Sequence, residues 1–383
     1  FLAGCLVKGQ EVDDSGNELG MFIDSFSQSW ARCCSFAGMK PDEFIRKLAH
    51  WIRVDDIGFC SDLEETIIPA LSPAYRTALR NSLGQRLAEK PSDELPESER
   101  RSRLFQYQSS LSTLKKLLIS MNNTTDLIAA GEQYGFTPED CLGLTKMFVS
   151  RKQKGKALEW AERGLKCGAK ESQHRGELER LRRQLLVKSG RRDEAVQEAW
   201  DKFEQSPSIY TFKDVLACAS RTDKTELTNK ALVVFEKADL QQATVALYEL
   251  KAIDSLIRRI DVEKDEALKK MFYSTAIPIA ESLAKKYPKQ AARLYVAQAL
   301  VILDEKRAKA YYHAHDYLHE AKTLFERSSE TETWLRWVKI IRCEHRLKSS
   351  FMPDFEEVVA GKGPIRAPSF MERIADKLDR GTR

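Results

Sequence analysis

The 383-residue sequence lacks the short motifs that mark common catalytic and nucleotide-binding sites. It contains no GxxxxGK phosphate loop, no GxGxxG dinucleotide motif, no GxSxG nucleophile elbow and no HExxH zinc motif. None of its cysteines lies in a recognisable catalytic neighbourhood. We therefore predict that the chain is not an enzyme and has no catalytic residue, no cofactor and no small-molecule substrate.

Long apolar runs and cysteine pairs are also missing. No apolar stretch approaches the roughly 20 residues that cross a bilayer, and residues 1–7 lack the basic flank and length of a signal peptide. None of the eight cysteines belongs to a CxxC pair, which favours a reducing compartment. We expect a cytoplasmic protein without a membrane partner. Because the chain begins with Phe rather than Met, we also expect it to be a piece of a longer protein.

The residues that are present indicate helices. Hydrophobic residues make up 42% of the chain and charged residues 31%, a balance that supports a packed and soluble protein. Apolar residues recur at spacings of three and four almost everywhere, and alternating β-branched runs are absent. We predict an all-α fold.

One segment reads as a connection between domains. Residues 91–103 (PSDELPESERRSR) combine two prolines with serines and mixed charges and have no apolar face, which is typical of an exposed linker. We predict an N-terminal helical domain over residues 1–90 and a repeat domain over residues 104–360. Residues 361–383 break the helical pattern at GKGPIRAP and are predicted to form a C-terminal capping tail.

Short helices are predicted over residues 156–167, 176–188 and 193–205. A helix of three or four turns cannot bury its apolar stripe alone, so it must stack on its neighbours in sequence. Residues 190–203 (GRRDEAVQEAWDKF) resemble the tetratricopeptide pattern, in which small residues, here Ala195 and Ala199, let paired helices approach closely. We predict looser copies of this pattern at residues 155–161, 241–250, 290–303 and 308–325. We predict a tetratricopeptide-like α-solenoid of stacked short helix pairs, with a helical bundle as the alternative.

Three further segments carry a second resemblance: residues 11–23 (EVDDSGNELGMFI), 51–60 (WIRVDDIGFC) and 334–355 (WLRWVKIIRCEHRLKSSFMPDF). Together they resemble the helical region of bacterial SWIM zinc-finger proteins and of a related uncharacterised domain family. The resemblance implies an all-helical interaction region that follows a zinc finger with CxC and CxH ligand pairs. Cys343 and His345 read as CxH, but no CxC occurs. We therefore expect no metal site here and place any finger before residue 1.

Basic residues concentrate in residues 151–192, which hold 14 Lys or Arg and 5 Asp or Glu, a net charge of +9. Residues 1–72, by contrast, hold 12 acidic and 6 basic side chains. A positive field attracts phosphates, whereas the glutamates between these arginines are also typical of an ordinary solvated helix. The candidate partner-binding residues of this stretch are Arg175, Arg180, Arg182, Arg183, Arg191 and Arg192.

A second basic patch is predicted on one flank of a helix that places Trp334 and Trp337 on its apolar side. Single-strand nucleic-acid binders combine aromatics and basic groups on one surface, so their separation here favours tryptophans in the core. The candidate partner-binding residues of this patch are Arg336, Lys339, Arg342 and Arg346.

Histidines and acidic residues give weak metal signals. His315 and His319 are four residues apart in YYHAHDYLHEAK, but no third ligand is evident and we expect no metal there. His345 lies on an apolar helix side and is interpreted as structural, bonded to a backbone carbonyl. The run Asp13–Asp24 mimics a calcium loop, but Glu18 stands where such a loop needs Gly.

These observations favour a non-enzymatic scaffold or adaptor that binds a protein partner through a helical-repeat groove. The alternative is a nucleic-acid-binding accessory protein that uses its basic helical faces, which requires the two basic patches to share one surface.

Overall fold

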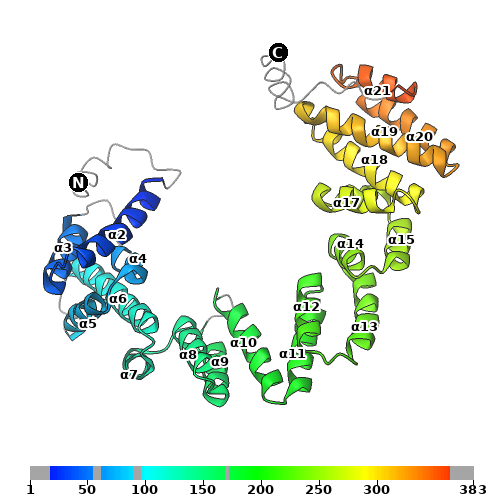
Figure 1. Cartoon of the computed structure of the whole chain (residues 1–383). Helices are drawn as coiled ribbons and strands as arrows, with labels where there is room; N and C mark the ends of the chain where they lie inside the picture. Colours follow the sequence, from blue (N-terminus) through cyan, green and yellow to red (C-terminus); the bar gives the residue numbers. More distant parts are fainter. Residues whose placement is uncertain (1–17, 55–61, 89–95, 169–171, 363–383) are drawn as a thin grey trace, which may run out of the picture. The chain divides into compact units, whose positions relative to one another are not determined.

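The computed structural model describes residues 18–54, 62–88, 96–168 and 172–362 (Figure 1). Every regular element within these ranges is a helix, and no strand occurs in them, so the all-α prediction is confirmed. The chain divides into two compact units, Phe1–Ala195 (unit 1) and Val196–Arg383 (unit 2). The boundary lies inside α11 (Arg192–Gln205).

The described helices of unit 1 are α2 (Glu18–Phe36), α3 (Pro41–Val54), α4 (Leu63–Thr66), the 3₁₀ turn η1 (Ile68–Ala70), α5 (Pro73–Ala88), α6 (Glu97–Ser120), α7 (Thr124–Tyr134), α8 (Pro138–Ser150), α9 (Lys154–Lys166) and α10 (Arg175–Lys188). Local residues determine where several of them begin. At α8, Thr137 and Asp140 form a reciprocal capping box, and Pro138 occupies the first helical position.

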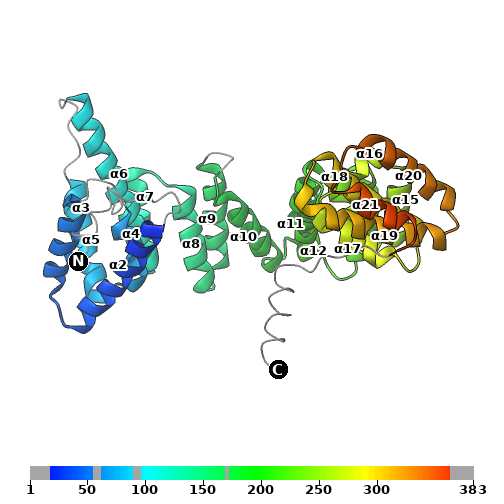
Figure 2. The same cartoon turned by 90° about the horizontal axis from the view of Figure 1, so that it is seen from above.

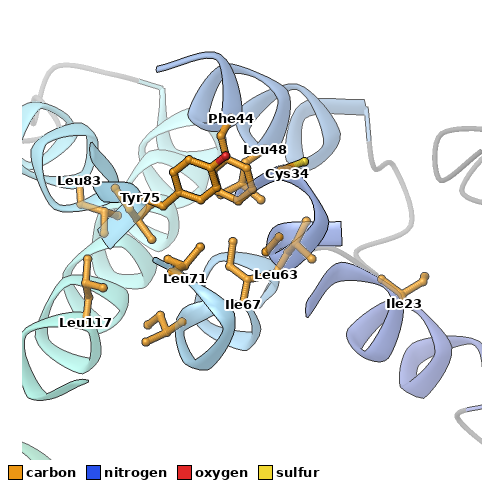
Figure 3. Packing of buried hydrophobic residues seen from close by; sticks show 13 residues of the cluster. Ile23, Cys34, Phe44, Leu48, Leu63, Ile67, Leu71, Tyr75, Leu83 and Leu117 are labelled. Atoms are coloured by element: carbon orange, nitrogen blue, oxygen red, sulfur yellow. The ribbon is translucent and has the colours of Figure 1, made fainter. Parts of the chain in front are cut away.

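An aromatic and aliphatic core joins the first helices of unit 1 (Figure 3). The Phe44 ring stacks on Tyr75 at a centroid distance of 4.3 Å and on Trp30 at 4.6 Å. Leu117 of α6 belongs to the same cluster and is fully buried. Each such buried side chain stabilises the fold by about 1.5–3 kcal/mol, so this core attaches α6 to the helices that precede it.

The predicted linker is partly helical. Residues 97–103 form the exposed first turns of α6, supported by i,i+4 ion pairs between Glu97 and Arg101 at 3.1 Å and between Glu99 and Arg103 at 2.9 Å. The linker prediction is wrong for these residues, because such pairs stabilise a helical turn that needs no apolar face. Residues 91–95 lie outside the described ranges, and the predicted boundary falls inside unit 1.

Unit 1 continues as stacked short helices. The predicted helices at 156–167 and 176–188 correspond to α9 and α10, and α8 contacts both of them. Gly164 permits the close approach: a Cβ there would lie 2.7 Å from the Cβ of Cys141 on α8 and 2.9 Å from Leu178 on α10. Contacts between helices one and two positions apart are the packing that a solenoid requires.

The helices that follow α11 in unit 2 are α12 (Ile209–Cys218), α13 (Lys224–Lys237), α14 (Leu240–Glu249), α15 (Ile253–Val262), α16 (Asp265–Leu268), α17 (Tyr273–Leu283), α18 (Pro288–Asp304), the 3₁₀ turn η2 (Ala308–Ala310), α19 (Tyr311–Arg327), α20 (Thr331–His345) and α21 (Met352–Val359). The remaining predicted repeat segments all lie on these elements or on α11. Ala195 and Ala199 are buried, as the close-packing argument requires.

Unit 2 also packs as a solenoid. Most consecutive helices contact one another, among them α12 to α15 in turn and α17 to α21 in turn. Contacts between α12 and α14, α13 and α15, α14 and α17, α15 and α18, and α19 and α21 connect helices further apart. The helix α18 packs against α15 and α16 as well as against α17 and α19. Figure 2 shows α15, α16 and α20 on one side of unit 2 and α17 and α19 on the other. The predicted capping tail lies outside the described residues, apart from residues 361–362.

Candidate partner-binding cleft

A polar cleft of about 550 Å³ opens in unit 2 between α15, α16, α18 and α20. Its walls and floor are formed by Asp261, Asp265, Lys289, Gln290, Arg293, Phe325, Thr333, Arg336 and Trp337. The residues come from five helices, because Phe325 belongs to α19, so the stacking of the array creates the cleft.

Helix geometry explains which side chains reach the cleft. The helix α18 begins at Pro288, so Lys289, Gln290 and Arg293 lie on its first two turns. On α20, Thr333, Arg336 and Trp337 follow the spacing i, i+3, i+4 and therefore share one face. The Trp337 ring is 8% exposed and supplies an apolar edge of the cleft, whereas Phe325 borders the cleft but is fully buried.

Arg293 fixes one wall of the cleft. Its guanidinium donates to the Asp265 carboxylate at 2.9 and 3.0 Å, and to the carbonyls of Ile260 at 2.7 Å and Glu263 at 2.6 Å. These bonds join the C-terminal end of α15, the start of α16 and the body of α18. Since the guanidinium is engaged on all sides, Arg293 holds the wall rather than presenting a charge to a ligand.

Glu330 organises the opposite rim. Its carboxylate pairs with Lys289 of α18 and accepts a hydrogen bond from the Thr333 hydroxyl at 2.7 Å. The bond from Lys289 is the main cause that lowers the pKa of Glu330, followed by the bond from Thr333, and the charge of Arg336 acts in the same direction. The rim carboxylate is therefore already satisfied within the chain.

Two charged groups in the cleft have no ionic partner among the described residues. The Asp261 carboxylate accepts only from the Gln290 amide, at 3.0 Å to each oxygen. The Arg336 guanidinium is exposed and makes neither a hydrogen bond nor an ion pair within the part of the chain that the structure describes. The cleft thus offers one carboxylate and one guanidinium beside the partly exposed Trp337 ring, an arrangement suited to a polypeptide segment.

The other candidates, on α20 and at Arg346 just after it, do not line the cleft. Lys339 and Arg346 are exposed, and Arg342 forms a bidentate pair with Glu356 of α21 at 2.9 and 2.5 Å. Arg336 is the only residue of the predicted α20 patch that lines this cleft. The prediction that Trp334 and Trp337 lie in the core is confirmed.

The predicted arginines of unit 1 are mostly engaged within the chain. Arg175 donates to Glu179 at 3.0 Å and to the Leu165 carbonyl at 3.3 Å. Arg182 lies between Glu162 at 3.4 Å and Glu194 at 3.1 Å. Two further pairs join residues three apart in the sequence: Arg180–Glu177 at 3.7 Å and Arg191–Glu194 at 2.6 Å.

The position of Arg183 differs most from the predicted partner-binding surface. It was expected at a partner-binding surface, yet only 3% of the residue is exposed. The side of α10 that looks polar in the sequence is partly covered, because a helix packed between neighbours has fewer outward positions than an isolated amphipathic helix. Arg192 is half-buried at the first position of α11. The two predicted basic groups belong to different units.

A smaller cleft of about 260 Å³ in unit 1 borders a buried ion pair. Lys115 of α6 donates to Asp140 of α8 at 2.7 Å and to the Gly135 carbonyl at 2.7 Å. Asp140 also accepts from the Thr137 backbone amide at 2.8 Å. Both charges are satisfied internally, so this pair clamps α6 to the start of α8.

The histidines of α19 point to different surroundings. His315 is buried, its Nε2 lies 2.9 Å from the Phe351 carbonyl, and its ring stacks on Phe351. His313 is exposed and packs beside the Tyr312 ring, whereas His319 is half-buried. Across the described ranges, no group of three His, Cys, Asp or Glu side chains is arranged to hold a metal ion.

His345 is buried, but its predicted hydrogen bond is wrong. Its Nδ1 lies 2.9 Å from the ammonium of Lys348, which donates to it, instead of bonding a backbone carbonyl. Burial is the main cause that lowers the pKa of His345, and the Lys348 charge adds to it. Residues 13–17 of the calcium-like run lie outside the described ranges, and Asp24 is exposed on α2.

Sequence reasoning missed the acidic half of the cleft. Asp261 and Asp265 belong to a stretch without an evident motif, and they join Arg336 only because α15 and α20 border the same side of α18. The sequence feature closest to a signal is the short helix α16 that directly follows α15, because it interrupts the regular repeat.

The comparisons with known proteins identify one family. A model of a family of unknown function (DUF6880) matches residues 146–353, which is more than half of the chain and includes every residue of the cleft. No curated protein and no solved structure matches. No helix in the described part of the chain has the length and apolar character of a bilayer-spanning segment. The resemblance to an uncharacterised domain family is thus confirmed in general form, and the chain belongs to the family of unknown function DUF6880.

Proposed function

We propose that the chain is a non-enzymatic scaffold or adaptor, and that the cleft between α15, α16, α18 and α20 holds a segment of a protein partner. The observation that carries this proposal is that Asp261 and Arg336 have no ionic partner among the described residues and lie in a cleft bordered by the partly exposed Trp337 ring. A peptide supplies both charge types, backbone hydrogen-bonding groups and apolar side chains, so it matches all three features.

The wider interpretation rests on the sequence. The tetratricopeptide-like pattern and the resemblance to SWIM zinc-finger proteins of bacteria both support an interaction role, and the absence of CxxC pairs supports a cytoplasmic location. Helical arrays of this kind present extended grooves to extended or helical segments. The nucleic-acid alternative has less support, because Arg175 and Arg182 are bound to glutamates and Arg183 is buried.

The test is a selection from a displayed library of random 16-residue peptides, followed by affinity measurements on two matched variants. Arg336→Glu reverses a charge in the cleft, and Lys339→Glu makes the same reversal one turn further along α20 outside it. We expect Arg336→Glu to weaken the selected peptides about tenfold, which corresponds to ~1.4 kcal/mol, and Lys339→Glu to leave their affinity nearly unchanged. Equal effects of the two variants, or a library that yields no binder, would overturn the proposal.

A further inference from the structure

A second surface of unit 2 lies on the side of α18 that packs against α17 and α19. It gathers four tyrosines and three carboxylates, and we call it the acidic tyrosine surface. Its members are Tyr273 and Glu281 of α17, Tyr295 of α18, and Tyr312, Asp316, Tyr317 and Glu320 of α19.

Ring contacts connect three of the tyrosines, Tyr295, Tyr317 and Tyr312. The Tyr295 and Tyr317 rings approach to a centroid distance of 5.9 Å across the α18–α19 contact. His313 stacks near Tyr317 at 6.1 Å and packs beside Tyr312 at 3.9 Å. Four aromatic rings therefore follow one another from the body of α18 to the first turn of α19.

The aromatic residues are unevenly exposed. Tyr273 is 70% exposed and Tyr312 is 49% exposed, although side chains of this size are normally drawn into a core. Tyr295, in contrast, is only 6% exposed. Its hydroxyl has no hydrogen-bond partner among the described residues but is not fully buried, so the end of the side chain reaches the surface.

The carboxylates around these rings are not neutralised. Glu281, Asp316 and Glu320 form no ion pair within the described residues, whereas Glu330 and Glu356 elsewhere in unit 2 each have a cationic partner. Burial, with the charges of Glu281 and Glu320, raises the pKa of Tyr295 to about 12. Burial, followed by the charges of Asp316 and Glu281, likewise raises the pKa of Tyr317.

Lys322, the cation on the next turn of α19, points elsewhere. Its ammonium donates to the Val359 carbonyl at 3.0 Å and to the Val358 carbonyl at 3.3 Å, at the end of α21. The negative potential over the tyrosines is therefore not compensated by this residue.

This chemistry selects a cation. The face of an aromatic ring attracts an ammonium or guanidinium group, and a carboxylate beside the ring adds a charge-assisted hydrogen bond. Phosphates are repelled by the same carboxylates, which excludes a nucleic-acid backbone as the occupant. Tyrosine also suits protein recognition, because it offers a large rigid contact area with few rotatable bonds.

We propose that the acidic tyrosine surface binds a cationic segment of a partner protein, with arginine or lysine side chains on the tyrosine faces and their charged ends toward Glu281, Asp316 and Glu320. Tyr295 supplies a partly covered hydroxyl that accepts or donates at the centre of the contact. The proposal goes beyond the cleft, since the two surfaces lie on different sides of α18 and share no residue.

The experiment measures fluorescence anisotropy of a labelled peptide in which six arginines alternate with glycines, at 50 and 200 mM NaCl. The Glu281→Gln/Glu320→Gln variant removes two charges from the surface, and Tyr273→Ala/Tyr312→Ala removes its two exposed rings. The matched control is Glu332→Gln/Glu344→Gln, which removes two exposed charges from α20. All the changed side chains are exposed, and circular dichroism and thermal unfolding would verify that each variant folds.

We expect each surface variant to weaken peptide binding about tenfold, and the control to change it less than about twofold. Salt dependence separates the two contributions: the glutamine variant should reduce the loss of affinity between 50 and 200 mM NaCl, and the alanine variant should leave that loss unchanged. Equal weakening by the control, or no binding at 50 mM NaCl, would overturn the proposal. Arg336→Glu should not weaken this peptide, so failure here is distinguishable from failure of the cleft.

Discussion

The helices α10 and α20 have similar basic sequences but use their charges differently. On α10, Arg175, Arg180 and Arg182 each bind a glutamate of the chain, and Arg183 is buried. On α20, Arg336 reaches a cleft and has no ionic partner in the described residues. The arginines of α10 thus form ion pairs within α10 and, through Arg182, with α9 and α11, whereas the Arg336 charge on α20 is available to a partner.

The net charge of a sequence segment therefore does not predict whether that segment forms a binding surface. Residues 151–192 carry the stronger net charge, yet glutamates from α9 and α11 meet their arginines. A partner senses the potential that is left after such pairs form. The useful quantity is the number of charged groups without an internal partner, which only the folded arrangement shows.

The largest expected effect concerns the buried pair that clamps α6 to α8. Lys115→Ala leaves the Asp140 carboxylate buried without its cation, since the two side chains are 6% and 4% exposed. We expect the free energy of unfolding to fall by about 3–5 kcal/mol, measured by urea denaturation. This result would show that a buried ion pair of unit 1 contributes to stability rather than to partner binding.

Two controls accompany that measurement. Lys47→Ala removes an exposed pair with Glu43, whose atoms are 3.0 Å apart, and should cost no more than about 0.5 kcal/mol. The double variant Lys115→Met/Asp140→Asn removes both charges and should recover much of the loss. If Lys115→Ala were as mild as Lys47→Ala, the clamp would not contribute to stability.

The next effect compares the two helices directly. Arg183→Glu puts a reversed charge into a site that is 3% exposed, and we expect it to lower the free energy of unfolding by about 2–3 kcal/mol. Arg336→Glu changes an exposed residue and should stay within about 0.5 kcal/mol of the unchanged protein. Thermal unfolding of both variants measures the difference. Similar midpoints would contradict the claim that Arg183 is structural and Arg336 is not.

Much of the fold could be predicted because its signal is local. The spacing of apolar residues identified α9, α10, α11 and α18, and the buried Ala195 and Ala199 followed from the repeat pattern. The start of α6 was missed because its first turns are exposed and depend on ion pairs rather than on an apolar face. Propensity and pairing at a helix end leave little trace in hydrophobic periodicity.

The site was less predictable because it is assembled over long distances in the sequence. Arg336 was identified from its helix flank, but its neighbours Asp261 and Arg293 come from other helices, and no spacing rule relates them. Arg183 was assigned to the surface because a single helix cannot show which flank its neighbours cover. Side-chain partners are a property of the packing, and one sequence specifies them only through the fold.

A nucleic-acid binding measurement tests whether α10 has a charge available to a partner. Arg180 is the most exposed arginine of the α10 ion pairs, with 54% of its side chain accessible. We expect a labelled 12-nucleotide single strand to bind weakly at 50 mM NaCl, and Arg180→Glu to change its affinity less than about twofold. A drop of about tenfold, with the salt slope reduced by about one, would identify α10 as a phosphate-binding helix.

The smallest expected effect lies on the buried side of α20. Burial, then the Lys348 charge, lowers the pKa of His345 from its ordinary value of 6.5. The unfolded chain therefore takes up a proton at a higher pH than the folded chain does. Stability from the neutral ring is complete above pH 6.5 and decreases as the pH falls from there toward the folded-state pKa.

Urea unfolding at about pH 7.5, 6.5 and 5.5 measures this term, because most carboxylates titrate below that window. The comparison protein is His345→Gln, which keeps a polar side chain but does not titrate, and all other histidines are present in both proteins. We expect the unchanged chain to lose more stability than His345→Gln between the highest and lowest pH. Equal losses would show that the ring is protonated alike in the folded and unfolded chains, with the Asp304 carboxylate, 3.7 Å from Nε2, offsetting the effect of burial.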